Sequence, residues 1–523
     1  MQGFKIALFG EPGSGKSAVV ERVISKKPQI RWLEVSRDII ASELSKLHGS
    51  YEEKRSQGKE IFDNLSAVEG PNWSSRRVIN AVEDSQHVIV TGVRGYSNFR
   101  HLSENGYCCV FVDCTSETSA ERISKRNGVS RETARKIIEK EASDFETRSI
   151  KDECHFVINN GRTISAAEYQ LFNICLSISS STEPVAKSAT CKTCVNSINN
   201  SSIYSSSEHE CDACRAFRMS QPHSAHLKNE FDHIVSKISA DNAHGRPILA
   251  GISGGKDSTV MLAQLSEIAK KTHAFTIDTG YYPISVLSRS KKVAHSLGCS
   301  HTVFDAREFL SDEIVSSYRK TAEFFETVAG QIGKDDYSET YNFTRKHYSI
   351  KENVSAPYPR PCVLCRRIVI RSYYELARQH GARFVFLGIN EWVNLADTSR
   401  TGDFNVSGIR LLQPTPDSEP VYVVHWPFVA QTNLEINRNR LEILGWEPPY
   451  GEDLVEANAN SCLLAKVTER DFARVMGFHP DSTRLAREVT AGFLPRSEAL
   501  TALASVHRTL WSAREVLEYA KIL

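Results

Sequence analysis

The sequence predicts an α/β protein with more than one domain, and three observations support this prediction. Two glycine-rich turns, at residues 10–17 and 253–258, each follow a short apolar run and precede a helical pattern. Further apolar runs alternate with helical stretches after each turn, which is typical of a parallel sheet covered by helices. With 523 residues, the chain is also too long for a single hydrophobic core.

The composition is that of an ordinary soluble globular protein, with 41% hydrophobic and 24% charged residues. Lys and Arg total 64 against 63 Asp and Glu, so any surface for nucleic acid must be local. No apolar run approaches the roughly 20 residues of a membrane span, and the apolar stretch at the N-terminus is too short for a signal peptide. We expect a cytoplasmic protein without a membrane partner. The sequence leaves open whether it forms an oligomer.

The first glycine-rich turn reads GEPGSGKS and lies between a predicted strand at residues 5–9 and a predicted helix from residue 18. It satisfies G-x-x-x-x-G-K-[ST], the P-loop, in the strand-to-helix context that this motif requires. Backbone N–H groups of such a loop cradle phosphates, the lysine reaches the β and γ phosphates, and the hydroxyl binds Mg²⁺. The expected ATP-binding residues are Gly10, Gly13, Gly15, Lys16 and Ser17, of which Ser17 also binds Mg²⁺.

Strands and helices continue to alternate through the first third of the chain. Apolar runs at residues 86–94 and 107–113 predict two more strands, and residues 166–176 predict a last helix. Residues 151–161 resemble the closing strand of a small nucleotide kinase. We therefore expect a three-layer P-loop domain with a parallel sheet over residues 1–176.

The strands of this region and its arginine-bearing segment at 121–126 resemble small nucleotide and dephospho-coenzyme A kinases. The resemblance implies that Arg122 and Arg126 clamp phosphates and that Arg94 lies nearer the acceptor. A solvated helix face explains such arginines equally well. The sequence leaves open whether this domain is a kinase, an ATPase or a nucleotide sensor.

A serine-rich stretch without apolar period, residues 177–190, predicts a flexible linker. Two CxxC pairs follow, separated by sixteen residues. Four soft thiolates with no open position suit a structural zinc ion, and a redox pair or a coincidence are the alternatives. We expect a small zinc ribbon at residues 191–225, with the ligands Cys191, Cys194, Cys211 and Cys214.

The second glycine-rich turn, SGGKDS at residues 253–258, again combines glycines, a lysine and a helix N-terminus after a strand. These features favour a phosphate site, and a turn that merely joins a strand to a helix is the alternative. The motif resembles the PP-loop of the ATP pyrophosphatase superfamily, whose members cleave ATP between the α and β phosphates to adenylate a substrate oxygen. The resemblance implies a PP-loop (HUP-like) α/β domain at residues 226–455.

This resemblance also assigns residues to ATP. It implies that Asp278 and Thr279, after the next predicted strand, hold the adenosine, and that Asp257 contacts Mg²⁺ or organises the loop. The remaining residues expected at this site are the ligands Ser253, Gly254 and Gly255 and the catalytic residues Lys256 and Ser258.

A second set of cysteines lies in the C-terminal half of the chain. Cys362 and Cys365 form a CxxC pair beside Arg360, Arg366 and Arg367, and we expect these cations to lower the pKa of the thiols. With Cys462, the pair resembles the three ligands of the [4Fe–4S] cluster in tRNA thiolases of the PP-loop superfamily. A catalytic disulfide relay, a second zinc site and a packing role are the alternatives.

The predicted helical C-terminal region, residues 456–523, contains GFHP and GFLPRSEAL, which resemble the sugar amidotransferase-like branch of the same superfamily. The leading hypothesis is ATP-dependent adenylation of a substrate oxygen, forming AMP and pyrophosphate, followed by sulfur insertion into a nucleobase of tRNA or another nucleic acid. The alternatives are amidation of a sugar or carboxylate and a nucleotide-sensing regulatory or defence ATPase. A separate protein that donates sulfur or ammonia is a possible partner.

Overall fold

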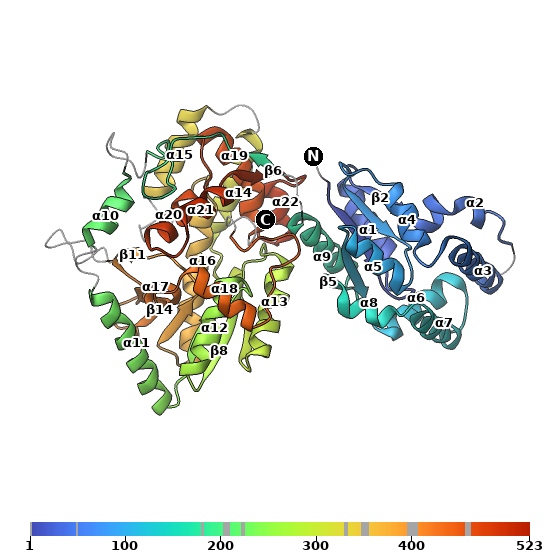
Figure 1. The fold of residues 1–523 in the computed structure, drawn as a ribbon, viewed down its shortest axis with the longest axis horizontal. Helices are drawn as coiled ribbons and strands as arrows, with labels where there is room; N and C mark the ends of the chain where they lie inside the picture. The colour runs from blue at the N-terminus through green and yellow to red at the C-terminus, as the bar shows by residue number, and fades with distance from the viewer. Residues whose placement is uncertain are drawn as a thin grey trace. The chain divides into compact units, whose positions relative to one another are not determined.

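Two sheets, one in each half of the chain, organise the protein (Figure 1). The computed structural model describes residues 3–48, 51–178, 182–201, 210–220, 225–328, 333–346, 355–394, 406–455 and 462–523. The chain divides into two compact units, residues 1–181 and 182–523. The predicted α/β class is therefore confirmed. None of the helices in the described ranges is long and apolar enough to cross a membrane.

The first unit is built on a five-stranded parallel sheet in the order β2-β3-β1-β4-β5. Its central strand is buried because Ile6, Ala7 and Leu8 are almost fully covered by helices and neighbouring strands. The strands are β1 (Lys5–Phe9), β2 (Arg31–Glu34), β3 (Val88–Thr91), β4 (Cys108–Asp113) and β5 (Phe156–Asn159). The sequence reasoning missed β2, which is short and has an exposed first residue.

Helices connect the strands of this sheet and cover its faces (Figure 1). They are α1 (Lys16–Lys26), the π-helix Val35–Ile39, α2 (Ala41–Leu44), α3 (Tyr51–Glu69), α4 (Trp73–Asn80), α5 (Tyr96–Glu104), α6 (Ser116–Asn127), α7 (Arg131–Asp144), α8 (Thr147–Glu153) and α9 (Ile164–Ser177). The helix α1 begins at Lys16, so the 10–17 loop joins the central strand to the first helix.

The second unit contains a six-stranded sheet in the order β13-β14-β10-β7-β8-β9, which is parallel except for the edge strand β13. Its strands are β7 (Ile248–Gly251), β8 (Thr272–Asp278), β9 (Ser300–Asp305), β10 (Phe384–Leu387), β13 (Ile409–Leu412) and β14 (Val421–His425). Two short antiparallel pairs lie outside it: β11 (Val393–Asn394) with β12 (Val406–Ser407), and β6 (Thr182–Pro184) with β15 (Ser505–His507).

The helices of the second unit include a C-terminal set, as the sequence predicts. Those before β14 are α10 (Asp212–Ser220), α11 (Ala225–Ala243), α12 (Lys256–Ile268), α13 (Ile284–Ser296), the 3-10 helix Ala306–Phe309, α14 (Asp312–Val328), α15 (Lys334–Lys346) and α16 (Cys362–His380). Those after it are α17 (Trp426–Val429), α18 (Leu434–Ile443), α19 (Leu463–Met476), α20 (Ser482–Thr490), α21 (Arg496–Ala502) and α22 (Ala513–Tyr519).

The order of the strands in this sheet creates a switch point beside β7. The chain runs outward from β7 to β8 and β9 on one side, then returns to place β10 and β14 on the other side. At such a reversal, the connections after the two central strands leave in opposite directions and open a crevice at the carboxyl ends of the strands. The 253–258 loop follows β7 directly, so it lies at this crevice.

The second unit takes in more than one of the predicted domains. Its first strand, β6, lies within the predicted linker and pairs with β15 near the C-terminus. Arg496, at the start of α21, donates to the carbonyl oxygens of Cys194 and Cys191 at 2.9 and 3.2 Å. The C-terminal helices and the CxxC region thus pack together, and the finer domain boundaries stay predictions.

Candidate functional site

The 10–17 loop is shaped by glycines that no other residue can replace without strain. Gly13 and Gly15 have φ angles of +77° and +90°. A Cβ atom on Gly15 would lie 2.3 Å from Nδ2 of Asn160, and one on Gly13 would lie 2.6 Å from the Ser119 carbonyl oxygen. Gly10, at φ +143°, is crowded in the same way by Val112. The backbone here packs too closely for a side chain, as a phosphate-cradling loop requires.

The Lys16 ammonium lies over its own loop. It donates to the carbonyl oxygens of Gly10 and Glu11 at 2.7 and 3.0 Å. Burial, with a contribution from the nearby cations Arg94 and Arg126, lowers the pKa of Lys16 to about 8. An anionic ligand beside this ammonium would raise its pKa again.

Arg122 and Arg126 come from the same helix but differ in their surroundings. The Arg122 guanidinium donates to the Asn160 carbonyl oxygen at 3.1 Å and approaches that of Ser14 at 3.4 Å. Arg126 Nε bonds Oδ1 of its neighbour Asn127 at 3.2 Å, and its charge reaches Lys16. Ser17, the second residue of α1, follows Lys16 at the start of the helix. Both arginines thus lie near the loop, and their role as phosphate ligands stays a prediction, like that of Ser17 toward Mg²⁺.

The 253–258 loop is closed by its own serines. Oγ of Ser258 donates to the Gly255 carbonyl oxygen at 3.1 Å and accepts from the Ser253 amide at 3.2 Å. Gly254 has a φ of +70°, and a Cβ atom there would lie 2.8–2.9 Å from atoms of Arg289. The loop thus has one fixed shape, which leads into α12 at Lys256.

Lys256 and Asp257 form an ion pair at the start of α12. The distance from Nζ of Lys256 to Oδ2 of Asp257 is 2.6 Å, and both side chains are largely buried. Oδ1 of Asp257 accepts from Nδ2 of Asn437 at 3.0 Å, and the ammonium stands 5.9 Å from the centre of the Phe493 ring. Asp257 thus links the start of α12 to α18, and its role toward Mg²⁺ or the loop stays a prediction.

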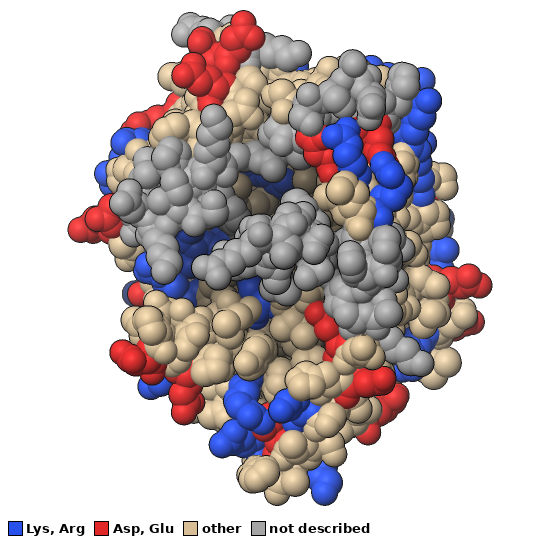
Figure 2. Space-filling model, turned by 90° about the vertical axis from the view of Figure 1, so that its left-hand side faces the viewer, with Lys and Arg blue, Asp and Glu red and all other residues tan. Residues whose placement is uncertain are grey.

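A cavity of about 590 Å³ joins the 253–258 loop to the second set of cysteines. Ser253 and Ser258 line it, as do Cys362, Cys365 and Cys462. The three cysteines come from the start of α16 and the residue before α19, so the fold gathers segments that are far apart in the sequence. Figure 2 shows Lys and Arg side chains inside a hollow on one face of the molecule.

The cysteine thiols in this cavity are half-buried and their pKa values are raised, which corrects one expectation. Burial raises the pKa of Cys362 even though Arg360 acts to lower it, and burial raises the pKa of Cys365 to about 12. The pKa of Cys462 is likewise raised by burial. The expectation that neighbouring arginines lower the pKa of Cys362 and Cys365 is wrong, because removal from water outweighs the nearby positive charge.

The spacing of these thiols bears on the kind of metal that they fit. Among the described residues, Cys362, Cys365 and Cys462 do not bring all three sulfur atoms within 4.8 Å of one another. A tetrahedral zinc ion with Zn–S bonds of about 2.3 Å holds its sulfur ligands roughly 3.8 Å apart. As they stand, the three thiols are therefore not spaced for a tetrahedral zinc ion. Hydroxyl groups of Tyr281 and Tyr282 hydrogen-bond the Cys365 sulfur and supply polar contacts beside it.

The wall of the cavity is strongly basic. Five arginines line it, together with the carboxylate of Glu391: Arg360, Arg366, Arg410, Arg484 and Arg487. Burial acts to raise the pKa of Glu391, but the positive charges of the neighbouring arginines, that of Arg487 first, outweigh burial, so the pKa is lowered. Sequence reasoning singled out Arg360 and Arg366, which flank the CxxC pair. It missed Arg410, Arg484 and Arg487, because only the folded chain brings β13 and α20 to this wall.

Asp278 and Thr279, expected to hold adenosine, lie at the end of β8 outside the set of residues that line the cavity. Oδ1 of Asp278 accepts from the Gly280 amide at 2.8 Å, and Thr279 is fully buried. The preceding residues Thr276 and Ile277 line the cavity instead. The assignment of Asp278 and Thr279 to adenosine stays a prediction.

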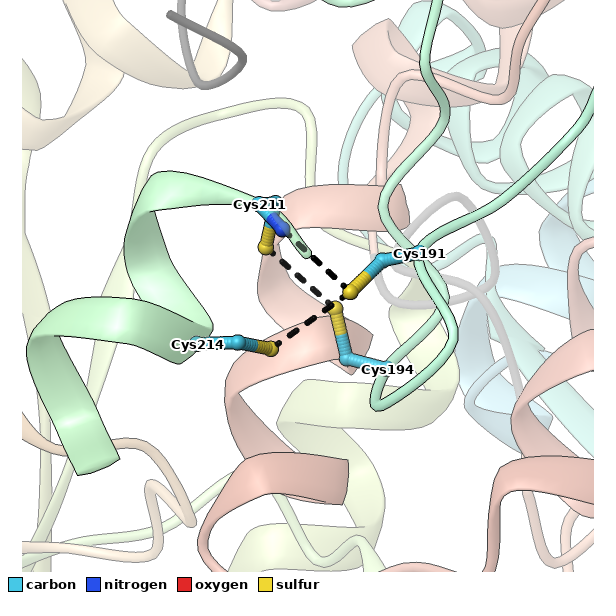
Figure 3. A group of neighbouring side chains, drawn as sticks. All are labelled: Cys191, Cys194, Cys211 and Cys214. Carbon is cyan, nitrogen blue, oxygen red and sulfur yellow. Dashed lines mark hydrogen bonds between the residues drawn. The ribbon is translucent and has the colours of Figure 1, made fainter. Parts of the chain in front are cut away.

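The structure brings the four cysteines of the predicted zinc ribbon together (Figure 3). Their sulfur atoms all lie within 4.8 Å of one another, with 3.8 Å between Cys191 and Cys214 and 3.6 Å between Cys194 and Cys211. The backbone amide of Asn196 donates to the Cys194 sulfur at 3.4 Å, and its side chain donates to that of Cys211 at 3.3 Å. Four buried thiols at these distances fit one tetrahedral metal ion, and N–H donors to sulfur stabilise thiolate ligands.

Comparisons with known proteins reach only the N-terminal third of the chain. No family model matches the chain. The protein TT1252 from Thermus thermophilus is 18% identical, with a TM-score of 0.25, over 33% of this chain and 97% of that one. Shikimate kinases from Bacteroides thetaiotaomicron and, in complex with shikimate, from Acinetobacter baumannii are 15% and 16% identical, each with a TM-score of 0.24. They cover 33% and 34% of this chain and 97% and 94% of their own. Resemblances of this extent carry no argument about activity, so the proposals below rest on the chain's own geometry.

Proposed function

We propose that the second unit is a PP-loop enzyme that adenylates a carbonyl oxygen of a nucleobase and then replaces this oxygen by sulfur. The observation that carries the proposal is the single cavity lined by Ser253 and Ser258 at one place and by Cys362, Cys365 and Cys462 at another. ATP activation and sulfur delivery would then occur in one cavity, so that the adenylate need not leave the protein between the two steps.

The residues of the 253–258 loop would act on the phosphates of ATP. Glycine N–H groups, the N-terminus of α12 and Lys256 would hold the β and γ phosphates as the leaving pyrophosphate, with Mg²⁺ sharing the charge. Phosphate oxygens would compete with Asp257 for the Lys256 ammonium, which lies 2.6 Å from that carboxylate. The substrate oxygen attacks the α phosphorus, and the bond to the β phosphate breaks.

In the second half of the reaction, sulfide replaces oxygen without any change of oxidation state, so no external oxidant is needed. A sulfide equivalent attacks the carbon that carries the adenylated oxygen, and AMP leaves with that oxygen. Cys362, Cys365 and Cys462 would hold a [4Fe–4S] cluster, and a cluster with three protein ligands has one iron open to an exogenous sulfide when it is bound. The buried hydroxyls of Tyr281 and Tyr282 would hydrogen-bond the ligand sulfur of Cys365.

Two supporting sites complete the proposal. The four-cysteine site would hold structural zinc, which ties the segment before α11 to α21 through Arg496. The first unit would bind ATP and Mg²⁺ at the 10–17 loop, where Lys16 is held with a lowered pKa. The cysteines in the cavity favour sulfur over ammonia as the nucleophile. Amidation of a sugar or carboxylate is therefore the second candidate function.

Product analysis tests the proposal, because the two loops would yield different products. Wild-type protein with ATP, Mg²⁺ and total RNA should release AMP and pyrophosphate. Lys256→Ala should abolish AMP formation, whereas Lys16→Ala, the matched change in the other loop, should leave it intact. ADP as the sole product, or AMP formation that survives Lys256→Ala, contradicts the assignment of the 253–258 loop.

A further inference from the structure

The helix α20 forms part of the cavity wall through three side chains, Thr483, Arg484 and Arg487. It runs for nine residues from Ser482 to Thr490, and its first turn has no side-chain cap from Asp481. The N-terminal end of a helix carries a partial positive charge and N–H groups that attract anions. This end of α20 therefore favours a negatively charged ligand, although a helix end alone does not make a site.

Unpartnered polar atoms at the same wall are a second and independent sign of a ligand. Thr483 is only 7% exposed, and its hydroxyl has no hydrogen-bond partner within the described ranges. One turn along the helix, Nε of Arg487 is a second buried atom without a hydrogen-bond partner in the described ranges. Residues four apart lie side by side on a helix, so the two groups belong to one face. A buried polar atom left without a hydrogen-bond partner destabilises the fold, and a ligand that accepts from both groups would remove this penalty.

Carboxylates fix the cationic groups of α20 in place; Asp481 and Glu488 are buried, and Glu391 is half-buried. Arg484 pairs with Asp481 at 2.7 Å and with Glu488, and Arg487 pairs with Glu391 at 2.9 Å while it lies 5.4 Å from the centre of the Trp392 ring. These three carboxylates face the five arginines of the wall, and burial lowers the pKa of His425 to about 4, so this histidine adds no charge. The wall keeps an excess of positive charge that suits an anion.

The N-terminal end of α20 is distant from the loop that would hold ATP. At the other end of the helix, burial raises the pKa of Glu488 while the charges of Arg484 and Lys256 act to lower it, and the Lys256 ammonium stands over the Phe493 ring. At the N-terminal end, Asp481 pairs with Arg360, two residues before Cys362. The helix rises roughly 10 Å from Thr483 to Thr490. The triphosphate at the loop and an anion at Thr483 would therefore occupy separate places.

We propose that Thr483, Arg487 and the N-terminal end of α20 bind a phosphate group of the acceptor, at the cysteine end of the cavity. The inference rests on the proposed function, which requires an acceptor in this cavity, and it narrows that acceptor to a phosphorylated molecule of the nucleotide type. A phosphate oxygen can accept from a hydroxyl, a guanidinium and a helix N–H at once. The phosphate belongs either to a free nucleotide or to a polynucleotide backbone.

Binding measurements on the full chain test this site without turnover. The 253–258 loop is first saturated with α,β-methylene-ATP, and the affinities for UMP and for a short single-stranded oligouridylate are then measured. Thr483→Val should weaken binding of the phosphate probe about tenfold, the equivalent of one lost charge-assisted hydrogen bond. Thr483→Ser should retain it, and Arg487→Gln should weaken it further. Comparable binding of UMP points to a free nucleotide, whereas binding of the oligouridylate alone points to a backbone phosphate.

The control is Thr490→Val on the same helix, because the Thr490 hydroxyl already bonds the Ala486 carbonyl oxygen at 2.7 Å. It should leave the affinity for both probes unchanged. The proposal is overturned if wild-type protein binds neither probe, if Thr483→Val binds them like wild type, or if Thr483→Val loses affinity for α,β-methylene-ATP in the same proportion. If Arg487→Gln lowers the thermal midpoint, its loss of affinity could come from unfolding, and the affinity of Thr483→Val alone then tests the proposal. A protein that forms no AMP refutes the proposed function, while probe binding still reports on this site.

Discussion

Gly254→Ala offers a quantitative test of the 253–258 loop, because the added methyl group meets two separate obstacles. The backbone at Gly254 is left-handed, with φ +70°, which costs an alanine about 1–2 kcal/mol. The Cβ atom would also lie 2.8–2.9 Å from Arg289, including its backbone carbonyl carbon, and overpacking of this kind costs another ~1–3 kcal/mol. Relief of the clash must displace either α13 or the loop itself.

The matched control is Gly381→Ala, which has a similar φ of +62° and no neighbouring atom within 4 Å of its Cβ position. The control isolates the backbone cost from the clash. Gly254→Ala should therefore lower the thermal midpoint more than Gly381→Ala, by the equivalent of about 1–3 kcal/mol, and should lose AMP formation, which the control retains. Equal midpoints together with undiminished AMP formation in Gly254→Ala would refute the reasoning.

Three further predictions concern the first unit and the cysteine sites. Gly15→Ala should abolish nucleotide binding at the 10–17 loop, because its Cβ atom would lie 2.3 Å from Nδ2 of Asn160. The control Gly128→Ala, with φ +69° and no atom within 4 Å of its Cβ position, should retain binding. Equilibrium dialysis can compare the two variants in protein that also carries Lys256→Ala, which removes binding at the second loop. The pKa of Lys16 is about 8 in the folded, nucleotide-free protein and 10.5 without burial, so the unfolded state binds more protons between these values. The first unit should gain stability as the pH rises through this window, and Lys16→Met should remove the gain in a series of thermal midpoints; an unchanged slope in Lys16→Met contradicts the assignment. Removal of the metal from the four-cysteine site by a chelator, or Cys211→Ser, should lower the thermal midpoint, whereas Cys175→Ser, a buried thiol outside the site, should retain the metal content measured by elemental analysis.

Local sequence patterns predicted the two loops, because a strand, a glycine turn and a helix follow one another directly in the chain. Lys16 and Lys256 begin α1 and α12 for this reason. The four cysteines of the CxxC pairs were also predictable, since metal geometry restricts their spacing. Each of these features depends on residues close together in sequence or on a spacing that suits a tetrahedral metal ion.

The wall of the cavity was not predictable in the same way, because packing between distant segments creates it. Nothing in the sequence around Thr483 or Arg487 distinguishes them from a solvated helix face, yet α20 lies beside residues from β10 and α16. The ionisation of Cys362 and Cys365 was predicted wrongly because a sequence shows neighbouring charges but not burial, and burial dominates here.

The central claim is that one cavity combines ATP activation with sulfur chemistry at Cys362, Cys365 and Cys462. The most direct measurement is the absorbance spectrum of anaerobically purified protein, with and without α,β-methylene-ATP, beside iron and sulfide analysis. We expect a brown protein with a broad absorbance band at about 400 nm and equal amounts of iron and sulfide, all of which Cys462→Ala should lose. Addition of the analogue should shift the spectrum of the wild type but not that of Lys256→Ala. A colourless protein that holds only zinc would contradict the claim of sulfur chemistry in this cavity.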